Sequence, residues 1–309
     1  MALHHKIHQL TVAQFEAQFP DDGACKSYLQ AQRWPDGVCC PRCLNENVHA
    51  LPSKPFHWVC NNCSASRTNY RFSVLVDTIF ENTNKGLREW FRVIHLMLTS
   101  KKGMSALQIQ RYMGFGSYET AHSMCHKIRT ALMDKEFQQL MGFVEVDETY
   151  VGGKNSNRHK DKRGGPGGTG GPTSPNGTAG KTAVIGAVQR KGNVVARVIA
   201  GTDTDTLHSF VREAVSTKVS LISTDEHSGY RHLRRDFNHG VVRHSAGEYV
   251  AGAVHTNTIE GFWSILKRGI VGTYHKVSAK YLPLYVAEFQ FRYNNRMNAD
   301  IFGAAVAGC

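Results

Sequence analysis

Long apolar runs and a secretory leader are both missing from this sequence of 309 residues. No run of eighteen apolar residues occurs, so we expect no membrane-spanning helix. The first residues, Met1 to His8, lack the apolar stretch of a signal peptide, which favours the cytoplasm. Thiols stay reduced in that compartment, so the eight cysteines are not expected to form a disulfide framework.

Acidic residues are scarce relative to basic ones. There are 25 Asp and Glu against 37 Lys and Arg, which gives a formal net charge of +12. This excess favours a polyanionic partner, because each phosphate contact made by Lys or Arg releases counterions. A basic enzyme without a nucleic-acid partner would show the same charge, so charge alone supports DNA binding only modestly. The hydrophobic fraction of 41% is sufficient for cores in two or three domains.

The cysteines cluster in a way that indicates a metal. Cys40 and Cys43 form one Cys-x-x-Cys pair, Cys60 and Cys63 form a second, and sixteen residues lie between them. This spacing predicts a structural Zn²⁺ site with four thiolate ligands, which stabilises a module too small for a large core. Four unconnected thiols are the alternative. Cys39 has the wrong spacing to Cys43, and we expect it to be a bystander.

A helix-turn-helix pattern follows the cysteines. Residues 105–113 predict a first helix, residues 114–116 a turn, and Ser117 or Thr120 the cap of a second helix that runs through Leu132. An ordinary helical hairpin would give the same pattern. If the second helix enters a DNA groove, the polar residues expected to contact DNA are His122, His126, Lys127 and Arg129.

An α/β region runs from residue 143 to about 297. Strands are predicted at 143–151, 182–189, 193–199 and 219–225, with a helix at 205–217 before the last of them. This order suits a ribonuclease-H-like mixed sheet, in which the first and fourth strands lie side by side. The segment 154–180 is rich first in charge and then in Gly and Pro, so we expect a mobile insertion.

Three acidic residues in this region could share a metal. Asp147 lies in the first strand, Asp225 ends the fourth, and Glu260 lies at the start of a predicted helix. Two neighbouring strands and one helix can bring three carboxylates to one point, where they would bind Mg²⁺, an ion that prefers oxygen ligands. Acids in such places are more often caps or solvated charges, so their spacing alone does not decide.

Two basic residues follow Glu260. Lys267 is two helical turns further on and shares a helix face with Glu260, so its cation could hold a phosphodiester near the metals. Arg268 is adjacent and is expected to contact DNA. The alternative for Lys267 is an ordinary surface lysine.

Several separated blocks resemble bacterial insertion-sequence transposases of the ISXO-like group, whose members carry an N-terminal zinc ribbon. The blocks occur in the order of that family and cover about residues 20–300. They are Arg33–Gly37, Val144–Lys154, Thr224–Tyr230, His255–Arg268, Gly272–His275 and Glu288–Arg296.

The resemblance implies a DDE transposase. Asp147, Asp225 and Glu260 match the three metal-binding acids of the family, and Lys267 matches the basic residue that follows the Glu. Two Mg²⁺ (or Mn²⁺) ions at the catalytic site and one structural Zn²⁺ are the implied cofactors. The implied partners are double-stranded DNA, as terminal inverted repeats and as target, and further copies of the chain in a homo-oligomer on DNA.

The expected organisation has four parts. These are N-terminal helices at 1–34, a zinc ribbon at 35–80, a helical DNA-binding module at 85–135 and a ribonuclease-H-like catalytic domain at 142–300. The expected function is metal-dependent strand cleavage and strand transfer by a cytoplasmic, nucleoid-associated protein. Two alternatives stay open at this point: an inactive DNA-binding regulator, and a metal-dependent nuclease that only hydrolyses.

Overall fold

The computed structural model of this chain describes residues 10–63, 70–133, 138–153, 180–243, 250 and 252–309. The predicted insertion at 154–180 lies outside the described residues except for Gly180. The chain divides into two compact units, Met1–Met133 with Asn295–Cys309, and Asp134–Asn294. The C-terminal helix α9 (Ile301–Ala307) therefore belongs with the N-terminal unit.

An aromatic core in the N-terminal unit joins α1 (Val12–Gln18), α2 (Asp22–Arg33), α3 (Leu87–Thr99) and α9. Thr11 caps α1, since its side chain accepts from Gln14 N at 3.2 Å. The core rings pack at centroid distances of 5.1–6.1 Å. They belong to Phe15, Phe19, Tyr28, Phe91 and Phe302.

Cys60 is the last residue of a strand in a small antiparallel sheet, and the other three cysteines of the two pairs lie outside its strands. Its strands β1 (Val48–Ala50), β2 (His57–Cys60) and β3 (Tyr70–Ser73) pair in that order. A turn precedes the first cysteine pair, where Gly37 N donates to Trp34 O at 3.3 Å.

The helix-turn-helix pattern forms α4 (Ala106–Met113) and α5 (Tyr118–Ala131). Ser105 caps α4 by accepting from Gln108 N at 3.2 Å. Gly114 ends it in the left-handed region, with φ of 66°, where glycine has no Cβ penalty. Ser117, one of the two predicted candidates, caps α5 by accepting from Glu119 N at 3.1 Å.

The second unit contains a five-stranded mixed sheet of order β6-β5-β4-β7-β8. The first three strands of this unit are antiparallel neighbours, β7 pairs in parallel with β4, and β8 pairs in parallel with β7. This order confirms the ribonuclease-H-like prediction. The strand that the sequence did not reveal, β8, is the last one and has three residues. The bounds are β4 (Phe143–Val151), β5 (Thr182–Gln189), β6 (Val194–Ile199), β7 (Leu221–Thr224) and β8 (His239–Val241).

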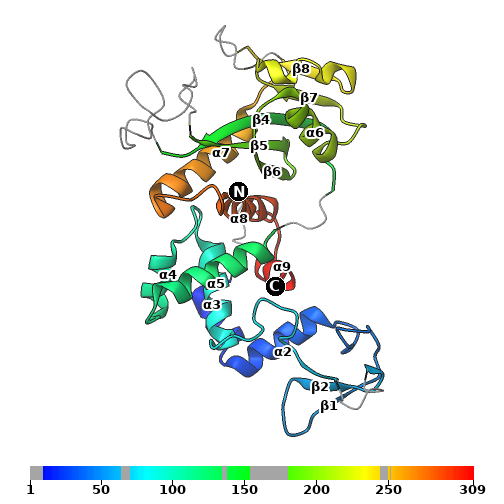
Figure 1. Cartoon of the computed structure of the whole chain (residues 1–309), viewed down its shortest axis with the longest axis vertical. Coiled ribbons are helices and arrows are strands. Elements are labelled where there is room, and N and C mark those ends of the chain that lie inside the picture. Colours follow the sequence, from blue (N-terminus) through cyan, green and yellow to red (C-terminus); the bar gives the residue numbers. More distant parts are fainter. Residues whose placement is uncertain (1–9, 64–69, 134–137, 154–179, 244–249, 251) are drawn as a thin grey trace, which may run out of the picture. The chain divides into compact units, whose positions relative to one another are not determined.

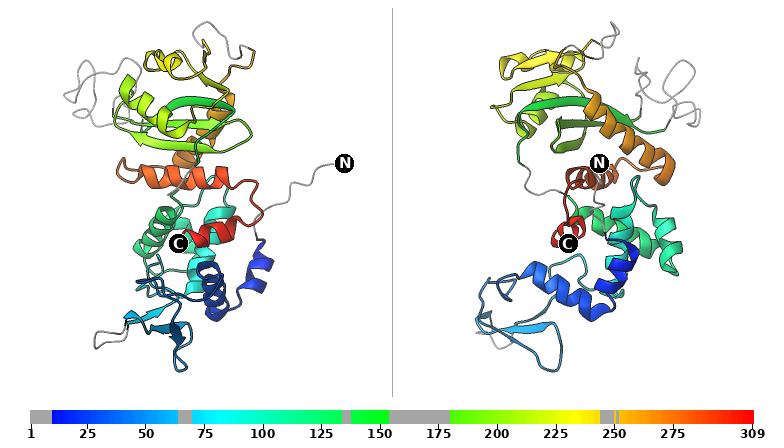
Figure 2. Two further views of the ribbon diagram at one scale, coloured as in Figure 1. Left: turned by 90° about the vertical axis from the view of Figure 1, so that its right-hand side faces the viewer. Right: turned by 180° about the vertical axis from the view of Figure 1, so that it is seen from behind.

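Helices cover both faces of this sheet (Figure 1). On one face, Val144 and Val146 of β4 pack with residues of α6 (Thr204–Ala214). On the other, Val151 packs with α7 (Asn257–Gly269) and α8 (Leu282–Asn294). Two further views show α7, in orange, lying beside the sheet (Figure 2). Alternate residues of β4 therefore face opposite layers, as the strand period requires.

Side-chain amides of α8 satisfy the outer edge of β6. Gln290 Oε1 accepts from Ala196 N, and Asn294 Oδ1 accepts from Val194 N, both at 2.8 Å. A free edge is a template for pairing with other chains, and this helix blocks it. Within the described part of the chain, no helix combines the length and apolar character needed to cross a bilayer.

Candidate active site and metal centres

The four cysteines of the two predicted pairs lie together. One sulfur from each of Cys40, Cys43, Cys60 and Cys63 lies within 4.8 Å of the others. The Sγ–Sγ distances are 3.8 Å from Cys40 to Cys63 and 3.7 Å from Cys43 to Cys60. Tetrahedral coordination with Zn–S bonds of about 2.3 Å requires sulfur separations of about 3.8 Å. The cluster fits a structural zinc ion, and Cys39 is not one of its members.

Pairing of β4 with β7 brings Asp147 to Asp225. The parallel register pairs Glu145 with Ser223, and both acids lie two residues further along their strands. One carboxylate oxygen from each lies within 4.8 Å of the other and of an oxygen of Glu148. Three carboxylates offer only hard oxygen ligands, which suit Mg²⁺ or Mn²⁺. These residues therefore fit a divalent metal site.

Burial and mutual repulsion both disfavour the charged form of these acids. Burial raises the pKa of Asp147 to about 8, and the charges of Glu148 and Asp225 add to the rise. The Trp263 indole opposes it, since its Nε1 donates to Asp147 Oδ2 at 3.0 Å. Burial also raises the pKa of Glu148. A divalent cation bound here would favour the carboxylate forms and offset both effects.

Glu148 is the member of the cluster that sequence reasoning missed. Strand alternation places its side chain on the opposite face of β4 from Asp147, so the strand pattern gives no sign that the two acids share a site. Its carboxylate is held by buried Tyr230, whose hydroxyl donates to Oε2 at 2.7 Å, and its Oε1 is 3.8 Å from His227 Nε2. The available signal was the Asp-Glu dipeptide in the middle of an apolar strand. Two adjacent acids are unusual there, and they could have indicated that Glu148 also has a functional role.

Helix α7 is fitted closely against the strand that carries Asp147. Gly186 of β5 pairs directly with Asp147. A Cβ at position 186 would lie 2.7 Å from Trp263 Cη2 and 3.2 Å from Ile259 Cδ1. The missing side chain at Gly186 gives the indole the space in which it reaches Asp147.

Glu260 lies on α7 but is not one of the clustered acids. It is exposed, and its Oε1 accepts from the Thr256 hydroxyl at 2.9 Å. Lys267 and Arg268 are exposed on the same helix, and Arg268 Nε donates to Ser264 O at 3.0 Å. The structure therefore brings two of the three predicted acids together and leaves the third on the adjoining helix.

The polar-face prediction for α5 is wrong at Arg129. Only 1% of this residue is exposed, because it follows Cys125 and Ala121 at four-residue steps along the buried stripe of the helix. Lys127 is exposed as expected, whereas the neighbouring rings of His122 and His126 are half-buried, with their centroids 4.1 Å apart. Burial lowers the pKa of His126 to about 4, so it is uncharged at neutral pH.

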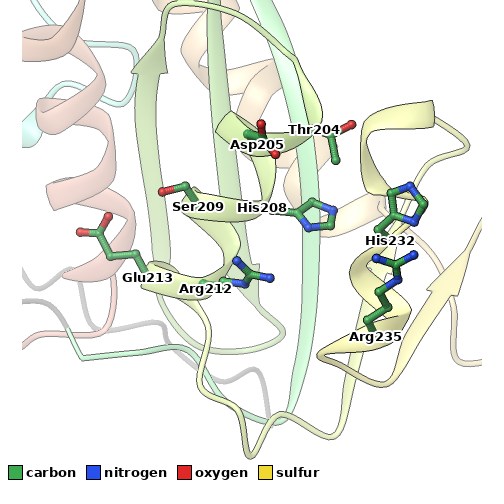
Figure 3. A pocket seen from close by; sticks show the side chains of 8 residues that line it. All are labelled: Thr204, Asp205, His208, Ser209, Arg212, Glu213, His232 and Arg235. Carbon is green, nitrogen blue, oxygen red and sulfur yellow. The ribbon is translucent and has the colours of Figure 1, made fainter.

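A hollow of about 570 Å³ lies elsewhere on the second unit, between α6 and the 3₁₀ segment η5 (Leu233–Arg235). Figure 3 shows His208 and Arg212 pointing from α6 towards His232 and Arg235. None of the residues that line this hollow is a clustered acid, and Asp205 and Glu213 balance its two arginines. It is therefore not a candidate for the metal-dependent chemistry.

Two regions of this chain match known protein families. Residues 139–294 match the family of the ISXO2-like transposase domain, and residues 20–66 match the transposase zinc-ribbon domain. The chain is 27% identical over 290 residues to an uncharacterised protein in transposable element ISH50 of Halobacterium salinarum. That alignment covers 89% of this chain and 91% of the relative. Because the first match spans half of the chain and contains the acid cluster, this protein belongs to the family with the ISXO2-like transposase domain.

Proposed function

We propose that this protein is the transposase of a bacterial insertion sequence, which binds the terminal inverted repeats and catalyses cleavage and transfer of DNA strands. The observation that carries the proposal is the β4–β7 pairing, which gathers Asp147 and Asp225 in a matched transposase domain. Family membership supports the general type of reaction, and the acid cluster supports the location of the active site.

The chemistry consists of two phosphoryl transfers. In the first, a water oxygen bonds to phosphorus at the element end, and the bond from phosphorus to the 3′ oxygen breaks to leave a free 3′-hydroxyl. In the second, that hydroxyl bonds to a phosphorus of target DNA and displaces a target 3′ oxygen, which leaves with a proton. One phosphodiester is broken and one formed in the second step, so no covalent protein intermediate is needed.

Asp147, Asp225 and Glu260 are the residues that would hold the divalent ions, with Glu148 beside them. Bound Mg²⁺ (or Mn²⁺), two ions at the site, would act as a Lewis acid towards the attacking and leaving oxygens. Glu260 would join the cluster from α7. Lys267 would hold the phosphodiester from the same face of α7, two turns from Glu260.

Recognition of the element end belongs to the N-terminal unit in this proposal. One Zn²⁺ on the four cysteines would stabilise the ribbon, and α5 would present Lys127 to the DNA. Phosphate contacts would position the protein and base contacts would specify the repeat. Copies of the chain would assemble on the two ends of the element in the bacterial nucleoid.

The test is a cleavage and joining assay with purified full-length protein, Mg²⁺, a labelled element end and a target plasmid. We expect a nicked product with a 3′-hydroxyl and, from it, a larger product in which the labelled strand is joined to the plasmid. Nicking without joining would identify a nuclease that only hydrolyses. Sequence-specific binding without nicking would identify a regulator, and either result would overturn the proposal.

A further inference from the structure

Glu145 is a buried acid on the strand that carries Asp147. It precedes Asp147 by two residues in β4, so both side chains face α7, and it has no exposed surface. A fully buried carboxylate needs compensating partners, because its transfer from water is costly. Glu145 finds these partners in two other segments of the same unit.

The first segment is the beginning of α7. Glu145 Oε2 accepts from the backbone N–H groups of Thr258 at 2.7 Å and Ile259 at 3.1 Å, and Oε1 accepts from the Thr258 hydroxyl at 2.9 Å. The first N–H groups of a helix have no partner within the helix, and its positive end favours an anion. The N-cap residue, Thr256, makes no side-chain capping bond, so Glu145 replaces the usual local cap from a separate strand.

The second segment is the turn after β5. Arg190 Nε donates to Glu145 Oε1 at 2.7 Å and supplies the opposite charge. The same guanidinium donates to Ala253 O at 2.7 Å and His255 O at 3.1 Å, which lie on the chain that enters α7. His255 Nδ1 is itself 3.0 Å from Glu145 Oε1. The carboxylate therefore ties β4, the β5–β6 turn and the start of α7 together.

We infer that Glu145 is a positioning residue, which sets the place of α7, and with it Glu260, relative to Asp147. The link is short on both sides. On β4, a single residue separates Glu145 from Asp147, and on α7 Glu260 directly follows Ile259, whose N–H donates to Glu145. One turn further, the Trp263 indole reaches Asp147 itself. The inference rests on the proposed function, since it assumes that Glu260 and Asp147 serve one metal site.

A buried ion pair is a poor means of adding stability. Well-packed apolar side chains of similar volume often stabilise a protein as much or more, whereas directed hydrogen bonds favour one arrangement over its neighbours. The hydrogen bonds that Glu145 accepts from Thr258 and Ile259 are of this directed kind, and they fix the start of α7. Loss of its charge should accordingly change how tightly the acids hold a metal, beyond any change in the free energy of unfolding.

Mn²⁺ binding to the zinc-loaded, full-length protein, measured by isothermal titration calorimetry, tests this inference. The Asp147→Asn/Asp225→Asn double variant gives the background from other sites. Glu145→Gln keeps the side-chain volume and one acceptor oxygen, and we expect it to weaken Mn²⁺ binding on the order of 10–100-fold, as loss of outer-shell partners does. Cleavage by the variant should need correspondingly more Mn²⁺ and recover in part when it is supplied.

The matched control is Asp22→Asn in the other unit. Asp22 likewise accepts from two N–H groups at a helix start, those of Leu87 at 3.3 Å and Arg88 at 2.9 Å. This variant should lower the melting temperature and leave Mn²⁺ affinity unchanged. A Glu145→Gln protein that is less stable but binds Mn²⁺ as tightly as the wild type would overturn the inference, since its role would then be structural only.

A milder variant keeps the test decisive if Glu145→Gln does not fold by circular dichroism. Thr258→Val removes one hydroxyl contact and leaves the Glu145–Arg190 pair in place. It should weaken Mn²⁺ binding by less, in the same direction, and unchanged affinity in this folded protein would overturn the inference. A wild type whose Mn²⁺ titration equals the double-variant background would instead overturn the proposed function, and the inference with it.

Discussion

The two compact units gather their candidate metal ligands in different ways. In the N-terminal unit, four thiols come from two short turns beside a small sheet, and each pair spans only four residues. In the other unit, Asp147 and Asp225 are separated by most of a domain and meet only because β4 and β7 pair in parallel. The first site depends on local chain geometry, and the second depends on the tertiary fold.

Zinc removal should give the largest effect, and it should unfold part of the N-terminal unit while leaving the second unit folded. Structural zinc contributes an apparent free energy of about 10–16 kcal/mol in small zinc modules. Cys60→Ser should therefore lose the zinc, about one ion per chain in the wild type, together with end-specific DNA binding. Hydrogen exchange should increase in β1–β3 and stay unchanged in β4–β8.

Cys39→Ser is the matched control, because this neighbouring thiol is outside the cluster. It should keep its zinc and its DNA affinity. Metal analysis of the Cys40, Cys43, Cys60 and Cys63 quadruple serine variant gives the contrary case: stoichiometric zinc in that protein would show that the ion is held elsewhere.

Neutralising the acids should stop chemistry without unfolding the second unit. Asp147→Asn, Asp225→Asn and Glu260→Gln should each slow cleavage and joining by at least about a thousandfold, since in the proposed mechanism each removes charge that holds the metal ions. DNA binding should be nearly intact, because the proposal assigns it to Lys, Arg and the N-terminal unit. Asp236→Asn, which only weakens a surface pair with Arg212, should cleave normally. Near wild-type cleavage by any of the three would remove that residue from the set of ligands.

The fit between α7 and the sheet should be sensitive to a single methyl group. Gly186→Ala places a Cβ against the Trp263 ring, and overpacking of this kind costs about 1–3 kcal/mol of unfolding free energy. Gly261→Ala on the open side of α7 should have the opposite sign, because alanine is favoured over glycine in a helix by about 1 kcal/mol. Denaturant unfolding of both variants measures the difference. Equal stabilities would show that α7 is not packed on Gly186.

Substitution of two exposed lysines, one in each unit, should give the smallest effects. One substitution should mainly affect DNA binding and the other mainly cleavage. Lys127→Ala should lower the slope of log affinity against log salt by about one, as expected for a lost phosphate contact. Lys267→Ala should slow cleavage at saturating protein more than it weakens binding. The reverse pattern would exchange the roles of the two units. Arg129→Ala should instead destabilise the N-terminal unit, because the side chain is buried.

The same contrast explains how much of the molecule the sequence could predict. The cysteine pairs, the cap Ser117 and the bounds of β4 and β5 depend on neighbouring residues, and all are confirmed. The β4–β7 pairing was predicted from the order of elements rather than from local pattern.

Features that depend on packing were harder to predict. A polar residue on a helix gives no sign of whether its own stripe is buried, and Arg129 was placed on the wrong side for that reason. Glu148 joins the acids through the reach of its side chain and its bond to Tyr230, neither of which strand alternation reveals. The three residues of β8 carry too little periodicity to be distinguished from a loop.

The claim that Asp147 and Asp225 hold the catalytic metal is tested most directly by a change of ligand and metal together. Asp147→Cys and Asp225→Cys replace a hard oxygen with sulfur, which Mg²⁺ binds poorly and Mn²⁺ tolerates better. Cleavage of the labelled element end should be absent for both variants in Mg²⁺ and return in Mn²⁺, whereas the wild type should cleave in both metals. Cleavage by the cysteine variants in Mg²⁺ at the wild-type rate would contradict the account.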